Sequence, residues 1–296
     1  MIHSYHFTCQ EADIMEFTKV GTSQLAVLII GTVIFFAAPL MMAIIWKVKK
    51  KEKISTILIG AATFLLFALI LEKPIQNALV FPTLMGLPYH GAAQFLDANP
   101  VLWALVVGLF PGVFEETGRL VAYKTLLKNR KNRETSISHG IGHGGIEVIL
   151  VGGISYVTYI VYALMINSGT FGTLIEQAQA QGPDSVAQGY AIAAQLAAFS
   201  AGDLFLNIVE RIFAVLYHIG ASMLVFYACR DKKRFWLYPL AILLHTLIDG
   251  FVGLQIAGVI SVSAWASELL VAISGSLTFF GAYFLLYKKD ADKEKA

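Results

Sequence analysis

Long apolar runs, separated by short polar segments, make up most of the chain. A helix needs about 20 apolar residues to cross roughly 30 Å of hydrocarbon, because each helical residue adds about 1.5 Å. Runs of that length lie at about 22–46, 54–72, 100–127, 135–167, 197–229, 235–260 and 262–287. This pattern predicts an all-α fold, a polytopic bundle of seven transmembrane helices in which residues 1–296 form a single integral membrane domain.

The composition supports a multi-pass protein of the cell membrane. Hydrophobic residues make up 57% of the chain and charged residues 14%, whereas a soluble domain is usually about 25% charged. We therefore expect the lipid bilayer, and no nucleic acid, as the chain's surroundings. Cys9 and Cys229 lack the spacing of a metal or redox motif, so no disulfide framework is expected.

Basic residues mark one side of the predicted membrane. All but four of the 22 Lys and Arg residues lie in four clusters, at 47–53, 124–133, 230–234 and 288–295. These clusters end or follow the first, third, fifth and seventh runs. Because basic loops remain in the cytoplasm, we expect residues 1–21 outside the cell and residues 288–296 as a cytoplasmic tail.

Two longer segments are expected on the outer side. Residues 73–99 are apolar and rich in proline, which is typical of an interfacial or re-entrant segment. Residues 168–196 are predicted to form a short amphipathic helix that is broken at Gly182-Pro183.

Four central runs, within about 100–260, carry ionisable side chains that are costly in a bilayer and that mark functional sites by default. Residues four apart share one face of a helix. The groups are Glu115, Glu116 and Arg119 in the third run, His139, His143 and Glu147 in the fourth, Asp203, Asn207, Glu210, Arg211 and His218 in the fifth, and His245 and Asp249 in the sixth.

Four of these side chains are expected at one depth. Counted from the nearest cytoplasmic basic residue at about 1.5 Å per residue, they lie roughly 14–18 Å into the membrane. They come from four different helices, which indicates a shared site near the cytoplasmic leaflet. The four are Glu115, His143, His218 and His245.

The other ionisable groups allow structural interpretations. Glu210 and Arg211 lie further out and would form the wall of an outer vestibule or a structural ion pair, and Asp203 equally suits a helix cap. Arg119 is expected to pair with a neighbouring glutamate or to extend towards the cytoplasm. His139, near the cytoplasmic end of its run, equally suits an interfacial position.

A carboxylate with several imidazoles suits the activation of water. The carboxylate can take a proton from water and pass it to a leaving amine, while imidazoles bind a metal or stabilise an oxyanion. A proton- or ion-coupled transporter would use the same residue types strung along a path, and a non-catalytic scaffold would use them as interhelical hydrogen bonds. The single layer favours hydrolysis of a peptide bond. The polar residues from Asp203 to Arg211 lie at other depths, so a transport path stays an alternative.

At these residues the chain resembles the YhfC-type intramembrane proteases, within the superfamily of CAAX-prenyl proteases, bacteriocin-processing proteases and PrsW. The shared features are a Glu-Glu pair followed by a basic residue and a late His-x-x-x-Asn/Asp. Here they are Glu115-Glu116 with Arg119, and His245 with Asp249. The segments GHGGIE, residues 142–147, and ER with a later His218 resemble the middle motifs of the family.

The resemblance implies an intramembrane endopeptidase, of glutamic or metalloprotease type, acting on a membrane-embedded or membrane-associated peptide. It implies Glu115 as the base that activates water, with Glu116 assisting or structural. It also implies roles for His143, His218 and His245 at the oxyanion or a metal, with Glu147 and Asp249 ligating or orienting them. Arg119, Glu210 and Arg211 would support the site.

The resemblance leaves open whether a metal takes part; for the metalloprotease type it implies zinc or another divalent ion, with His143, Glu147, His218 and His245 as ligands. Three histidines with a carboxylate suit tetrahedral zinc, although the chain has no HExxH motif. The spacing here is EExxR, whereas the prenyl proteases have EExxxR, so Arg119 can point elsewhere than in that family. No histidine matches the FxxxH motif cleanly, which leaves open the histidine that holds the oxyanion.

Overall fold

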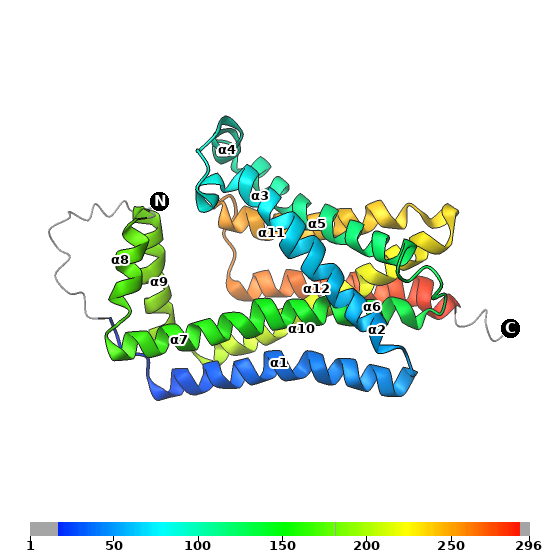
Figure 1. Cartoon of the computed structure of the whole chain (residues 1–296), viewed down its shortest axis with the longest axis horizontal. Coiled ribbons are helices and arrows are strands. Elements are labelled where there is room, and N and C mark those ends of the chain that lie inside the picture. Colours follow the sequence, from blue (N-terminus) through cyan, green and yellow to red (C-terminus); the bar gives the residue numbers. More distant parts are fainter. Residues whose placement is uncertain (1–16, 181, 291–296) are drawn as a thin grey trace. The chain divides into compact units, whose positions relative to one another are not determined.

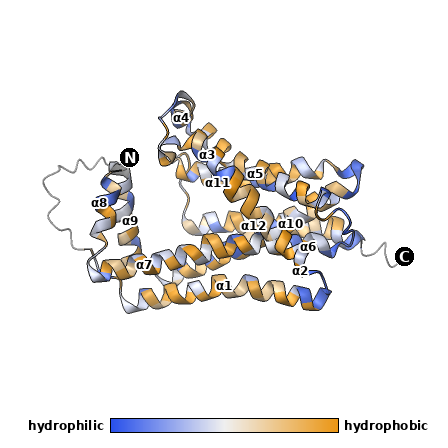
Figure 2. Ribbon diagram, viewed as in Figure 1, coloured by the Kyte–Doolittle hydropathy of each residue, from blue (hydrophilic) through white to orange (hydrophobic). Residues whose placement is uncertain are grey.

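The computed structural model describes residues 17–180 and 182–290, and within them every regular element is a helix. Seven helical segments of the described chain are long and apolar enough to cross a membrane, as expected. Figure 1 shows their succession along the chain, and Figure 2 shows by the colour of the ribbon that hydrophobic residues predominate in them. The side of the membrane assigned to each terminus stays a prediction, and residues 1–16 and 291–296 lie outside the description.

The spans are built from the following elements. The first three are α1 (Thr22–Lys50), the continuous run of α2 (Ile54–Phe64), η1 (Leu65–Glu72) and α3 (Lys73–Val80), and α5 (Pro100–Lys124). The fourth joins α6 (Glu134–Glu147), η3 (Val148–Ile154) and α7 (Ser155–Ser168). The last three are α10 (Ala201–Arg230), η4 (Lys232–Arg234) with α11 (Leu237–Ile256), and α12 (Ala264–Ala282) with η5 (Tyr283–Lys288).

The second span is longer than the apolar run that predicted it. The helix continues beyond residue 72 to Val80, so the first part of the expected outer segment 73–99 is helical. Pro74 follows a π-helical turn in which the Lys73 N–H reaches back to the Ala68 carbonyl, and such a turn accommodates a residue that lacks an N–H. The rest of this segment contains η2 (Pro82–Met85) and α4 (Gly91–Asp97).

The chain divides into two compact units. The described part of the first comprises residues 17–32 and 154–204, including α8 (Gly172–Gln179) and α9 (Pro183–Ala198). Gly182, between these two helices, has a φ of +108°, a conformation that favours glycine, so the expected break at Gly182-Pro183 is confirmed. Asp203 accepts a hydrogen bond from the Ser200 N–H at 2.8 Å, which confirms its role as a cap.

The described part of the second unit, residues 33–153 and 205–290, holds the ionisable groups of the central runs apart from Asp203. Glycines let its helices approach closely, as is common in membranes. On α6, a Cβ added at Gly140 would lie 2.5 Å from the Ile219 Cα of α10. On α5, a Cβ at Gly112 would lie 2.6 Å from the Thr246 Oγ1 of α11. These contacts hold α5, α6, α10 and α11 around the expected site.

Candidate active site

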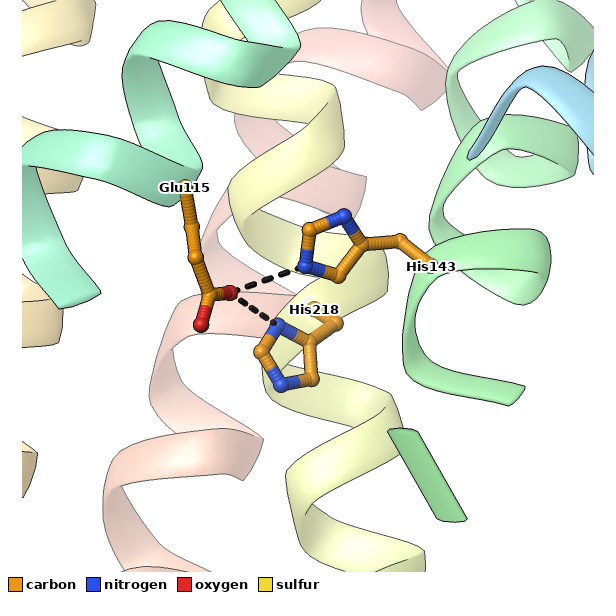
Figure 3. A group of neighbouring side chains, drawn as sticks. All are labelled: Glu115, His143 and His218. Atoms are coloured by element: carbon orange, nitrogen blue, oxygen red, sulfur yellow. Dashed lines mark hydrogen bonds and ion pairs between the residues drawn. The ribbon is translucent and has the colours of Figure 1, made fainter. Parts of the chain in front are cut away.

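The Glu115 carboxylate, on α5, is the centre of the polar cluster. Its Oε2 lies 2.8 Å from His143 Nε2 of α6, 3.9 Å from His218 Nδ1 of α10 and 4.0 Å from His245 Nε2 of α11. Figure 3 shows Glu115, His143 and His218 pointing toward one another from three helices. The structure thus brings together the four side chains that the sequence placed at one depth.

Small residues beside the histidines make this convergence possible. Gly144 follows His143, and a Cβ there would lie 3.2 Å from the Cβ of His218. Gly112 lies about one turn before Glu115 and contacts Thr246, the neighbour of His245. The glycine-rich sequence around His143 therefore allows α6 to approach α10 where the imidazoles must meet.

Glu116 and Arg119 form a second, fully buried group. Arg119 Nη1 donates to Glu116 Oε1 at 2.6 Å, and the same oxygen lies 2.9 Å from His245 Nδ1. Arg119 Nη2 lies 2.7 Å from His218 Nδ1. The expected pairing of Arg119 with a neighbouring glutamate is confirmed, and this pair ties α5 to the imidazoles of α10 and α11.

Glu147 and Arg211 form a further ion pair, between α6 and α10. Arg211 Nη1 donates to Glu147 Oε1 at 3.0 Å, and Arg211 Nε donates to Glu210 Oε2 at 2.9 Å. Glu147 Oε2 also contacts His218 Nε2. We call Glu115 and the three histidines around it the inner layer. Because the Glu147 carboxylate contacts both Arg211 and His218, it orients one imidazole of this layer.

A cavity of about 130 Å³ lies beside Glu115. It is large enough for several water molecules, since one needs only about 10–15 Å³ measured in this way. Asp249 reaches His245 from its wall, with Oδ2 3.5 Å from Nε2, as their spacing of four predicted. The polar lining consists of Glu115, Glu147, Glu210, Arg211, Tyr217, His218, His245 and Asp249.

Three residues near the site were missed or misplaced by the sequence. Glu72, the last residue of the apolar run 54–72, was not singled out; it is fully buried and pairs with Lys73 at 3.1 Å. His139 is fully buried beside Ser222, which overturns an interfacial position. Its spacing of four from His143 was the available signal. Tyr217, which lines the cavity, resembles any aromatic of an apolar run.

Glu115, His143 and His218 are compatible with a divalent metal. All three are buried, and each offers a donor atom within 4.8 Å of the other two. Carboxylate oxygen and imidazole nitrogen are the donor types that zinc takes, so the residues fit such an ion. The four-residue ligand set implied by the resemblance, with Glu147 and His245, stays a prediction.

Comparison with known proteins identifies the family of the chain. Residues 34–271 match the family described as YhfC intramembrane metalloprotease. A Bacillus subtilis (strain 168) protein described as "Uncharacterized membrane protein YhfC" is 31% identical over 250 residues, covering 83% of this chain and 90% of that protein. No solved structure matches the chain. The chain therefore belongs to the YhfC intramembrane metalloprotease family, as the motifs of its central spans predicted.

Proposed function

We propose that this chain is an intramembrane endopeptidase that hydrolyses a peptide bond of a membrane-embedded or membrane-associated protein. One observation carries the proposal. Glu115 lies at the wall of a polar cavity, with imidazoles from three other helices within 4.0 Å of one of its oxygens. Positioned carboxylates and imidazoles are the groups that general acid–base catalysis uses.

Glu115 is the base in this proposal. A water in the cavity gives one proton to the carboxylate while its oxygen bonds to the carbonyl carbon of the peptide. The C–N bond then breaks, and Glu115 returns the proton to the leaving amine, so that one water is consumed for each bond broken. His143, which contacts Oε2 at 2.8 Å, holds the carboxylate in place.

His245 faces the cavity and stabilises, through Nε2, the oxyanion that forms on the carbonyl oxygen, while His218, which also lines the cavity, is held by Glu147 and Arg119. Glu147 orients His218, and Asp249 orients His245. Glu116 is a positioning residue, because its Oε1 binds both Arg119 and His245 while its side chain is fully buried.

A divalent metal such as zinc would be held by His143 and His218, with His245 and Glu147 as the further ligands that the family resemblance implies, which leaves Glu115 beside the ion as the base. When bound, such an ion polarises a carbonyl or makes water more acidic. Arg119 Nη2 donates to His218 Nδ1 at 2.7 Å, so a cation at this nitrogen would compete with the guanidinium for the same lone pair.

The proposal is tested by comparing protein termini in cells that produce the wild type or Glu115→Gln at equal levels. Terminal-peptide mass spectrometry of the membrane fraction should find new termini with the wild type that are absent with Glu115→Gln. Glu210→Gln, which alters a carboxylate outside the inner layer, is the matched control and should retain these termini. Identical termini with wild type and Glu115→Gln would overturn the proposal.

A further inference from the structure

An apolar groove lies between α11 and α12, next to the polar cavity. It has a volume of about 370 Å³. Ile248 of α11 and Val271 of α12 line both the groove and the cavity. The groove therefore adjoins the space that contains Glu115, and these two side chains are all that the two linings share. Its other side chains include Leu244, Leu247 and Phe251 from α11, and Leu270, Ser274 and Leu277 from α12.

The two walls of the groove are held by different neighbours. A Cβ at Gly112 of α5 would lie 2.9 Å from the Ile242 carbonyl oxygen, which shows how closely α5 packs on α11. A Cβ at Gly275 of α12 would lie 2.5 Å from the Phe213 carbonyl oxygen of α10. Because α5 holds one wall and α10 holds the other, the groove is built into the packing of the helices.

The groove opens on the surface of the helix bundle that would face lipid. Leu247 is 56% exposed and Leu277 is 69% exposed. In a membrane these side chains face lipid, so an apolar chain can pass from the bilayer into the groove without crossing water. The far end reaches polar groups, since His245 and Asp249 line the adjoining cavity.

We propose that this groove binds the apolar side chains that flank the cleaved bond of the substrate, which enters between α11 and α12. This inference rests on the proposed peptidase function. A peptide segment matches both spaces, because its backbone amide is polar and its side chains can be apolar. A groove of this volume is at the small end of ligand pockets, and it suits a few side chains rather than a whole helix.

The experiment uses the full-length protein in membranes and measures the termini that depend on Glu115. Ser274→Trp fills the groove from α12, and Ile273→Trp places the same side chain at the adjacent, 45% exposed position outside the groove lining. We expect Ser274→Trp to lower these termini about 10- to 200-fold, the discrimination that one apolar pocket provides. Ile273→Trp should leave them near the wild-type level.

Phe251→Ala, which enlarges the groove, keeps the inference testable if Ser274→Trp folds poorly. It should shift the residues next to the cleaved bond towards larger side chains, and a purely structural role would not change this preference. Unchanged cleavage and preference in both groove variants, the result expected if only lipid occupies the groove, would overturn the inference. Equal losses in Ser274→Trp and Ile273→Trp would also overturn it, because they would show a general effect of Trp on α12. Termini that persist in Glu115→Gln would overturn the peptidase function itself.

Discussion

Two arginines in the central helices each pair with two glutamates, but in different surroundings. The side chain of Arg119 is fully buried and that of Arg211 is 14% exposed. Arg119 lies 2.6 Å from Glu116 and 3.7 Å from Glu115 on its own helix, and it also donates to Ser222 and His218 of α10. Arg211 pairs with the adjacent Glu210 and with Glu147 of α6, at the cavity wall.

The comparison shows that position, rather than the type of charge, separates the two groups. A fully buried guanidinium needs a partner for each of its three nitrogens, because desolvation of an unpaired charge is costly. Arg119 meets this need with bonds to two helices, and so fixes the Glu116 carboxylate and the His218 imidazole. Arg211 also orients a carboxylate, that of Glu147. Because water in the cavity can solvate its guanidinium, we expect the fold to depend less on Arg211 than on Arg119.

The largest effect is expected from Arg119→Leu. Loss of this cation leaves the Glu116 carboxylate buried without its partner, which should lower the free energy of unfolding by about 3–5 kcal/mol. Denaturant titration in detergent micelles would measure the loss. Equal destabilisation by Arg119→Leu and Arg211→Leu would show that burial does not distinguish the two pairs.

The close approach of α6 and α10 supports the inner layer, and Gly140→Ala should disturb it. The new methyl would meet the backbone of Ile219 at 2.5 Å, and overpacking of this kind costs about 1–3 kcal/mol. Gly145→Ala is the control on the same helix, since its methyl would meet only the Pro39 side chain, at 3.4 Å. Thermal unfolding should separate the two variants, and equal melting temperatures would contradict the packing described here.

Metal content should distinguish the inner layer around Glu115 from the ion pair of Glu210 and Arg211. We expect purified wild-type protein to retain a divalent metal and His143→Ala to bind it at least about 10- to 100-fold more weakly, the loss seen even for partners of metal ligands. Glu210→Gln should retain the wild-type content. Elemental analysis of the purified proteins measures this without reference to activity. Equal metal content in all three would remove His143 from the ligand set.

The smallest effect is expected from Arg211→Leu. Its partly exposed ion pairs should contribute about 1 kcal/mol to the stability of the fold. Cleavage should fall modestly, because Glu147 would still contact His218. The same denaturant titration and the Glu115-dependent termini would report both effects. A loss as large as that of Arg119→Leu would place Arg211 in the buried core of the site.

The sequence predicted the spans and the inner layer because both depend on regular helix geometry. A constant rise per residue turns the distance from a basic cluster into depth, and this placed Glu115 with His143, His218 and His245. Which of two adjacent glutamates faces the cavity depends on helix rotation, which packing decides. Glu72 was missed for two reasons. A π-helical turn carries the helix past the end of the apolar run, and the Glu72 carboxylate pairs with Lys73. A hydropathy profile shows neither feature.

The most direct measurement is the cleavage rate of an identified substrate by purified protein in liposomes. We expect Glu115→Gln to lower the rate by about 10²- to 10⁴-fold, the usual contribution of a general base, with the melting temperature unchanged. Glu210→Gln should retain most of the rate. Full activity of Glu115→Gln, or an equal loss in both variants, would contradict the assignment of Glu115 as the base that activates water.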